Sequence, residues 1–458
     1  MKFRSAFSVV CFSLIAAAAN AKTLYVDGAN GNDATTYAAN SASAPWRTLG
    51  RAVWGNASRT SSNTSEAARA GDIVMVSGGP FTAPSTNERY LPAFNPVNSG
   101  TASAPIEIRA VGRVELRTTG GNGPAMGSYM RDHIRWIGHF FIDEANSTVR
   151  ADTGTTVIWD NTGAVIDGCE IVARPVTYVD NHNGIRFENA RQATVRNCRI
   201  TGVVGQGGAL HHNNAGMMLY YSNGVTIENN EINNAGSGVY PKGGWNQNIT
   251  IRYNRINNTR KAIRITYSER ASGENYVYQN VLSNGQGEET LGIEIAEDSH
   301  NWTVTNNTIY NIDNGIYLSP LVGSDLVLGG NIISNTSTAY NAWEVPLAIP
   351  APGRNLYFSP GQWATNGRTF STLSTWLAAA PGDAGSIVSN PAFTNAAGGD
   401  FTIAQASPAR NLSVDVLDLD RDGSRTDTVA AGAYVTGTEV IGLNTGPTPN
   451  PPTALTVQ

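Results

Sequence analysis

The sequence predicts an all-β fold, a single-stranded right-handed parallel β-helix, from three observations. The first is a repeat of about 24 to 32 residues between Gly184 and Ser334, a period typical of arrays built from one supersecondary unit. The second is that each repeat contains strand-length apolar pieces without helical spacing, which argues against leucine-rich and helical solenoids. The third is a residue that recurs where the second strand of each repeat ends, at Cys198, Asn230, Asn254, Asn280, Asn307 and Asn331.

Each repeat is interpreted as one rung of the solenoid. Asparagine suits the turn of a rung, because its side chain tolerates a left-handed backbone and can bond the asparagine of the next rung. The first strands of six successive rungs line up at Ile185, Met217, Val239, Ile263, Ile293 and Ile316. We expect these apolar residues to face the core.

Residues 1–21 are predicted to be a secretory signal peptide. They contain two basic residues, an apolar run over Phe7–Ala18 and small residues at the expected cleavage site. The run is shorter than the roughly 20 residues that cross a bilayer, so we expect a secreted protein, extracellular or periplasmic, without a membrane partner. Residues 22–440 are expected to form the β-helix with its caps, and residues 441–458 a proline-rich disordered tail.

Short helices are expected at both ends of the solenoid, near Trp46–Trp54 and around Leu373–Leu377. The first would close an end that otherwise exposes core and sheet edges. Cys169 and Cys198 fall at the same phase of consecutive rungs, which lie about 4.8 Å apart. A disulfide and two buried thiols are both open at this point.

The net charge of -5 and a pI near 5.7 give no basic footprint for nucleic acid, and we expect a monomer. A turn near the C-terminus contains half of a calcium-binding loop, with aspartate at Asp418, Asp420 and Asp422. The twelfth position is Val429 rather than glutamate. The sequence allows calcium there without requiring it, and an ordinary Asp/Gly turn explains the same residues.

Strand side chains alternate, so the aligned first strands also define an outer row. The row mixes aromatic, basic and acidic residues, and consists of Arg186, Glu188, Met218, Tyr220, Tyr240, Lys242, Arg264, Thr266, Glu294, Tyr317 and Ser319. Tyrosines offer sugar rings an apolar face with a hydrogen-bonding edge, and cations bind carboxylates. The sequence therefore predicts a surface for an acidic polysaccharide of the alginate or pectate type. Its expected binding residues are Arg186, Glu188, Tyr240, Glu294 and Tyr317.

Two long connections arrive just before these strands, Val203–Asn214 with His211 and His212, and Asn284–Leu291 with two glutamates. Extra residues on one side of a solenoid tend to border its binding face. We expect the connections to form walls of a groove and the histidines to contact the polysaccharide. Ordinary loop variation with solvated side chains is the alternative.

Lys242 and Arg264 occupy outward positions on adjacent rungs. β-Elimination from a uronic acid needs a base for the C5 proton, a clamp for charge developing on the carboxylate and a donor for the departing O4. A neighbouring cation would lower the ordinary lysine pKa of about 10.4. We therefore predict Lys242 as the base, Arg264 as the clamp and Tyr220 as the acid. The alternative is structural, with Lys242 on a wet sheet face and Arg264 paired with Glu294.

The segments around Lys242 and Arg264 resemble the β-helical uronate lyases of the chondroitinase B and alginate lyase group. That resemblance implies a lysine base and a nearby arginine on successive coils. Such enzymes often use calcium, held by Asn and Glu just before the lysine, but Asn233–Tyr240 contains no Glu or Asp. The opening and closing segments resemble those of secreted pectate-lyase-like proteins. The general resemblance to such β-helices covers nearly the whole mature chain.

Two other functions fit parts of the same surface. A glycoside hydrolase needs two carboxyl groups about 5 to 9.5 Å apart. Glu188 and Glu294 are roughly 19 Å apart, four rungs at one strand spacing each, so the second carboxyl would have to come from the glutamate loop or Glu297. A noncatalytic glycan-binding or adhesive solenoid would present the same tyrosines and arginines without needing Lys242.

Overall fold

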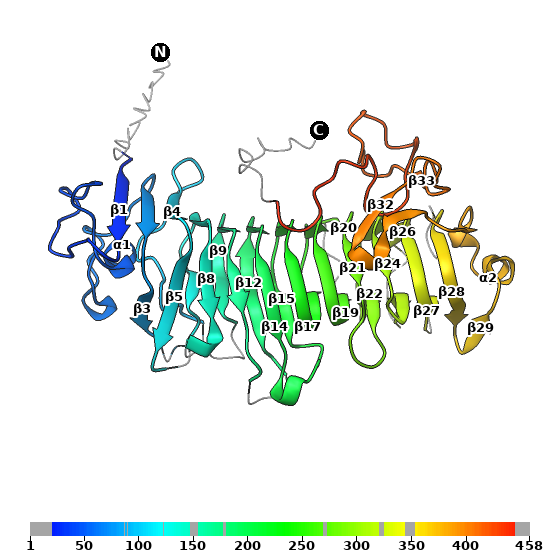
Figure 1. Ribbon diagram of the computed structural model, residues 1–458, viewed down its shortest axis with the longest axis horizontal. Helices are drawn as coiled ribbons and strands as arrows, with labels where there is room; N and C mark the ends of the chain where they lie inside the picture. The colour runs from blue at the N-terminus through cyan, green and yellow to red at the C-terminus, as the bar shows by residue number, and fades with distance from the viewer. Residues whose placement is uncertain are drawn as a thin grey trace, which may run out of the picture.

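The computed structural model describes residues 21–444, apart from 87, 89, 122, 147–153, 177–179, 269–272, 320–324 and 344–352. Within that part the chain winds into an elongated parallel β-helix (Figure 1). The predicted fold is confirmed. Residues 1–20 of the predicted signal peptide and residues 445–458 of the predicted tail, which was expected to begin at residue 441, lie outside the described residues.

One face of the described solenoid is a sheet of parallel strands, one from each rung. Its strands are β1 (Thr23–Asp27), β2 (Ile73–Ser77), β4 (Ile106–Ala110), β7 (Ile134–Ile137), β10 (Val165–Asp167), β13 (Thr194–Arg196), β16 (Thr226–Glu228), β18 (Thr250–Arg252), β20 (Asn275–Tyr278), β23 (Trp302–Thr305) and β26 (Val327–Gly329).

A second sheet bends around the rest of each rung, because its long strands pass through both of its halves. The first half of β17 pairs with β14 and its second half with β15. The strands are β3 (Phe81–Pro84), β5 (Val114–Thr119), β6 (Met126–Tyr129), β8 (Phe140–Asp143), β9 (Thr156–Thr162), β11 (Glu170–Val172), β12 (Asn183–Arg191), β14 (Arg199–Val203), β15 (Ala215–Tyr220), β17 (Glu231–Pro241), β19 (Arg255–Thr266), β21 (Val281–Ser283), β22 (Leu291–Ala296), β24 (Thr308–Tyr310), β25 (Asn314–Leu318), β27 (Ile332–Ala342), β28 (Leu356–Thr365), β29 (Arg368–Phe370) and β30 (Ile387–Val388).

The residues predicted to face the core form one column in register along this sheet. Ile185 pairs with Met217, Met217 with Val239, and the column continues through Ile263 and Ile293. All are fully buried, and each contributes about 1.5–3 kcal/mol through removal of its apolar surface from water.

Glycine occupies the corner where the second sheet bends. A Cβ at Gly184 would lie 2.7 Å from Ile200 Cγ2, and one at Gly216 would lie 2.6 Å from Ile232 Cγ2. The isoleucine side chain therefore fits into the corner only because glycine has no Cβ.

The predicted asparagine ladder is present and buried. In each rung from Asn230 to Asn331 the side-chain amide donates to Oδ1 of the next asparagine over 2.9 to 3.2 Å. Backbone N–H groups donate to the same oxygens, so the ladder satisfies turn groups that are shut off from water.

Replacing Asn280 with alanine is expected to destabilise the protein by about 2–4 kcal/mol, because it orphans several buried polar groups. Asn280 Oδ1 accepts from the backbone and side chain of Asn254, and its own amide donates to two backbone carbonyls. Urea unfolding followed by circular dichroism measures the change. Asn233→Ala is the control, because its exposed side chain can be replaced by water. Equal losses in both variants would contradict the role given to the ladder.

Cys169 and Cys198 are stacked on consecutive rungs and are both free. Their sulfur atoms are 3.0 Å apart, compared with about 2.05 Å in a disulfide. The N–H of Cys198 donates to Asn230 Oδ1, so of the two alternatives the structure has buried thiols that continue the ladder.

Both predicted helices are present, as α1 (Leu49–Trp54) and α2 (Leu373–Ala379). Helix α1 starts three residues later than predicted and is buried along its whole length, where it packs with Leu24 and Val26 over the end of the core. Neither is long and apolar enough to span a membrane, nor is any other helix of the described chain.

The C-terminal part returns along the solenoid, which the sequence did not indicate (Figure 1, orange to red). It contains two small antiparallel pairs, β31 (Phe393–Asn395) with β32 (Asp400–Ile403) and β33 (Ser413–Val414) with β34 (Thr428–Val429). The N–H of Ala433 donates to Thr308, and that of Asn444 donates to Asn197, four rungs back. This segment therefore ties the turns of several rungs together.

Candidate functional site

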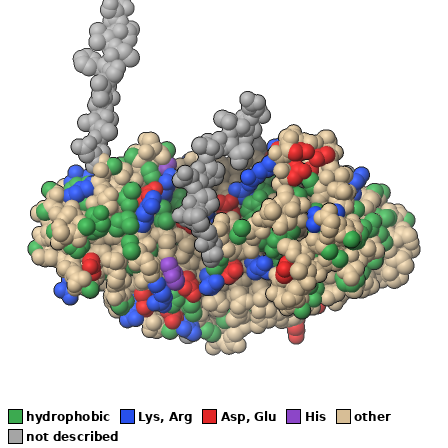
Figure 2. All heavy atoms as spheres, turned by 45° about the horizontal axis from the view of Figure 1, so that its top comes forward, with side chains coloured by type: hydrophobic (Ala, Val, Ile, Leu, Met, Phe, Trp, Pro, Cys, Tyr) green, Lys and Arg blue, Asp and Glu red, His purple; other side chains and the backbone are tan. Residues whose placement is uncertain are grey.

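The predicted outer row lies on the side of the second sheet opposite the core column. One line of residues in register consists of Arg186, Met218, Tyr240, Arg264, Glu294, Tyr317 and Asn341. A parallel line consists of Trp159, Glu188, Tyr220, Lys242, Thr266 and Ala296. Figure 2 shows acidic and basic side chains interspersed on the face in view, in keeping with the modest net charge.

Much of the first line is buried, contrary to the expectation of an open face. Tyr240 is 1% exposed, Glu294 5% and Arg264 8%. The loop with the two histidines packs against this part of the sheet, where Ser237 Oγ donates to the His212 carbonyl over 2.7 Å. The His212 ring also lies 6.2 Å from that of Tyr240. The interpretation of Tyr240 as an exposed stacking platform is therefore wrong.

Arg264 meets a carboxylate of the protein itself. Its Nε donates to Glu294 Oε2 over 2.7 Å, and its Nη1 donates to the Tyr240 hydroxyl over 2.7 Å. Lys261 Nζ, a cation that the sequence analysis missed, donates to the same glutamate oxygen over 2.7 Å. One buried carboxylate thus balances two cations, which is the structural alternative considered for Arg264.

Lys242 has a different environment. Its Nζ donates to Asn213 Oδ1 over 2.8 Å and lies 5.9 Å from the ring centre of Tyr220 and 5.7 Å from that of Tyr240. Among the described residues, the hydrogen-bond partner of this half-buried amine is an amide. Asn213 was missed by the sequence analysis, although it lies in the connection that was expected to border the face.

Electrostatics favour the neutral form of this amine. Burial lowers the pKa of Lys242, and the positive charges of Arg264 and Arg186 lower it further. The negative charges of Asp180 and Glu297 oppose the shift without reversing it. A lysine whose pKa is lowered in this way can serve as a general base closer to neutral pH.

The rings of the two loop histidines are in contact, with centres 4.1 Å apart and planes tilted by 33°. His211 Nδ1 accepts the N–H of Asn213 over 3.3 Å and lies 3.8 Å from Asp180. Burial lowers the pKa of His211. Burial and then the charge of Arg264 lower the pKa of His212 to about 3, so this ring is neutral near pH 7. The loop borders the face as predicted, without adding a positive charge to it.

The N-terminal end of the face is aromatic. Arg186 donates to Glu188 through Nε and Nη2, over 3.0 and 2.9 Å, and lies 4.5 Å from the Tyr220 ring centre. Burial raises the pKa of Tyr220, which keeps its phenol protonated at neutral pH. Tyr90 stacks on Trp159 at 3.9 Å beside this group. Trp159 could have been found from its strand register, whereas Tyr90 comes from an irregular loop without a repeat signal.

A cavity of about 280 Å³ continues the face past Glu294. It is lined by Arg260, Lys261, Glu289, Leu291, Glu294, Asn314, Tyr317 and Asn341. Tyr317 thus borders a hollow on the predicted face, and the glutamate loop forms one of its walls, as expected from the length of that connection.

A buried pair anchors the histidine loop. His182 Nε2 lies 3.0 Å from Glu144 Oε2, its Nδ1 lies 3.0 Å from the Val204 carbonyl, and its backbone N–H donates to Asn214. Burial opposes protonation of His182, but its bond with Glu144 outweighs this and raises its pKa. The ends of the loop that carries Asn213 are therefore fixed.

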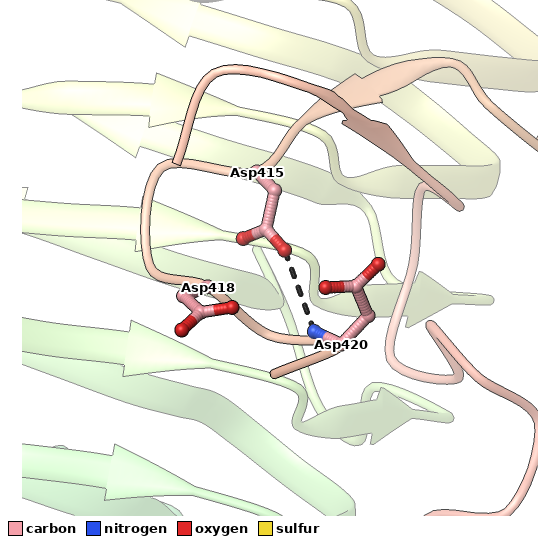
Figure 3. A group of neighbouring side chains, drawn as sticks. All are labelled: Asp415, Asp418 and Asp420. Carbon is pink, nitrogen blue, oxygen red and sulfur yellow. Dashed lines mark hydrogen bonds between the residues drawn. The ribbon is translucent and has the colours of Figure 1, made fainter. Parts of the chain in front are cut away.

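Aspartates gather on the C-terminal segment rather than beside Lys242. Asp415, Asp418 and Asp420 lie close enough to share an ion (Figure 3). The same holds for Asp420, Asp422 and Asp427. Buried Asp415 already accepts backbone N–H groups of Leu419 and Asp420, so the turn itself accounts for its position.

The face around Lys242 does not fit the calcium site of the resembling lyases. The segment before Lys242 supplies no carboxylate. Two rungs away on either side, Glu188 and Glu294 form ion pairs with Arg186 and Arg264.

Comparisons with known proteins agree with a β-helix. A family model described as a right handed beta helix region matches residues 142–288, which include Lys242 and Arg264. No curated protein sequence matches. Similar solved structures include pectate lyase Pel9A (TM-score 0.49, 11% identity, 90% of this chain and 96% of that chain), alginate lyase from Paenibacillus sp. str. FPU-7 (0.40, 16%, 65% and 92%) and GH136 lacto-N-biosidase from Eubacterium ramulus (0.44, 10%, 76% and 67%). Similarities this low say nothing of the activity of this chain.

Proposed function

We propose that the protein is a secreted lyase that cleaves a uronic-acid-containing polysaccharide of the alginate or pectate type by β-elimination. The observation that best supports this is Lys242, a half-buried amine with a lowered pKa that donates to Asn213 on an outward face. Tyrosine and arginine side chains flank it on the neighbouring rungs. A face that extends over several rungs suits a ligand that is itself a linear polymer.

In the proposed reaction the neutral Lys242 amine removes the proton from C5 of the uronate. The C5–H electrons form the C4=C5 bond, the C4–O4 bond breaks, and O4 takes a proton from the Tyr220 phenol. Donation of one amine hydrogen to Asn213 fixes the direction of the amine, so that its lone pair can be held towards the substrate.

The role of Arg264 is revised from a direct clamp to an electrostatic one. Two of its nitrogens are bonded to Glu294 and Tyr240, so a substrate carboxylate would have to compete with them. Its charge still lowers the pKa of Lys242 and favours negative charge that develops on the substrate.

A hydrolase is less well supported by the same geometry. Glu294, the carboxylate nearest the centre of the face, is held by Arg264 and Lys261, and Glu188 is held by Arg186. Glycoside hydrolysis needs one carboxyl group as a proton donor and a second as base or nucleophile, and neither of these residues is presented in that way.

Incubation of the purified protein with alginate, pectate and glycosaminoglycans is expected to give new ultraviolet absorbance from C4–C5 unsaturated ends with at least one of them. A parallel assay of reducing ends distinguishes the alternatives, because a hydrolase creates reducing ends without this absorbance. A neutral glucan is the control. Reducing ends without absorbance, or binding without either product, would contradict the lyase.

A further inference from the structure

Four aromatic side chains are strongly exposed in the described part of the chain, namely Tyr221 (53%), Trp245 (66%), Tyr267 (47%) and Trp343 (46%). Each follows closely after an outer-face strand, that is, a strand of the second sheet that carries the outer row. These strands are β15, β17, β19 and β27. Exposed apolar residues are normally scattered singly over a surface. The four exposed aromatics, by contrast, all follow strands of the second sheet on the same side, and three of them lie on consecutive rungs.

The backbone at this edge makes the aromatics more unusual. The residue that follows each member of the second outer line, from Trp159 to Ala296, has a positive φ on six successive rungs. These residues are Asp160 (43°), Asn189 (49°), Tyr221 (48°), Gly243 (75°), Tyr267 (55°) and Glu297 (52°). Glycine, asparagine and aspartate tolerate that conformation well, and bulky residues do not. Tyr221 and Tyr267, which flank the rung of Lys242, therefore occupy positions that the fold alone would give to other residues.

The exposed edge is continuous with the face that holds Lys242. The rings of Tyr221 and Tyr220 are 6.3 Å apart, and Tyr220 in turn lies beside Lys242. Gly243 follows Lys242 directly, and a Cβ there would lie 3.1 Å from the Tyr220 ring. On this rung the exposed aromatic comes two residues later, as Trp245, where φ is 76°.

We propose that Tyr221, Trp245 and Tyr267 form a stacking strip that holds sugar rings of the acidic polysaccharide beside Lys242. The nature of the ligand rests on the proposed function. Tyrosine and tryptophan combine an apolar face with a polar edge, which matches a sugar ring. One aromatic per rung, at about 4.8 Å per rung, gives a linear array that suits a linear polymer better than a compact partner.

The strip contacts sugars in the ground state as much as in the transition state, so its loss should raise KM and leave kcat unchanged. In the variant Tyr221→Asn/Tyr267→Asn, asparagine accepts the left-handed backbone, and the Tm should stay level or rise. Affinity is measured by affinity electrophoresis in gels containing alginate, pectate or a glycosaminoglycan, and on the polymer that the wild type binds it should fall about tenfold. A Tm that stays level or rises while the affinity for the polysaccharide falls would show that the two tyrosines bind the ligand and do not stabilise the fold.

Trp343→Ala is the matched control, because it removes an equally exposed aromatic three rungs beyond Tyr267, and its affinity should stay within about twofold of wild type. Wild-type affinity in the double variant would overturn the strip while leaving the lyase intact. Weaker binding in the double variant, with no unsaturated product from the wild type, would overturn the lyase and keep the strip. Sedimentation of the wild type and the double variant tests whether a second copy of the chain binds at this edge. A dimer that is lost in the double variant, at unchanged affinity for the polysaccharide, would assign the edge to that second copy and overturn the proposal.

Discussion

Lys242→Ala is expected to reduce kcat for elimination by about 10²–10⁴-fold, the contribution typical of a positioned general base. The side chain lies on the outer side of its sheet and makes one hydrogen bond to an amide, so the fold should lose little without it. Initial rates of unsaturated product, polysaccharide affinity and thermal unfolding measure the three quantities separately. We expect a large effect on the first and small effects on the other two.

Lys242→Arg tests whether the charge or the basic amine matters. A guanidinium keeps the positive charge but stays protonated at any ordinary pH, so it should be as inactive as alanine. If arginine restored the rate, Lys242 would act as a binding cation. If Lys242→Ala kept wild-type turnover, the base assignment would fail and neutral His212 would become the next candidate.

The fold could be predicted because its determinants recur locally along the chain. Alternation within each strand fixes which side chains meet in the core column, and a repeated asparagine marks each turn. The stacking of Ile185 on Met217 and of Asn230 on Asn254 follows from the period alone.

The state of the site residues could not be predicted in the same way. Outward orientation follows from the period, but burial of Tyr240 and Arg264 depends on a loop from another rung and on Glu294, which lies one rung further. Lys261 was within reach of sequence analysis, since it is aligned with Ser237 and Leu291 at the bend of the sheet. Asn213 was not, because a loop has no register from which to place its side chains.

The stacking strip could be predicted from the sequence only in part. A strand pattern locates the turn after each outer-face strand, and a tyrosine at Tyr221 or Tyr267 looks ordinary in sequence. Only the backbone angles show that the position favours other residues. Strain of this kind is visible in a structure and invisible in residue periodicity.

Glu294→Gln is expected to destabilise the protein by about 3–5 kcal/mol, because it leaves buried Arg264 and the largely buried Lys261 without their counter-ion. Glu294 Oε2 accepts from both Arg264 and Lys261 over 2.7 Å. Urea unfolding measures the loss. Glu231→Gln is the control, since its partner Arg199 lies 3.2 Å away in an exposed ion pair that is worth about 0–1 kcal/mol.

The same variant tests the coupling of Arg264 to Lys242 through the pH dependence of kcat/KM. A general base must be neutral, so activity rises with pH through the pKa of Lys242. Removal of the Glu294 charge leaves Arg264 positive and unbalanced, which lowers that pKa further, since Arg264 already lowers it. The acidic limb of the profile should therefore move to lower pH in Glu294→Gln and stay in place in Glu231→Gln. A limb that moved to higher pH would show that Arg264 does not tune the base, because the sign of the shift follows from the charge alone.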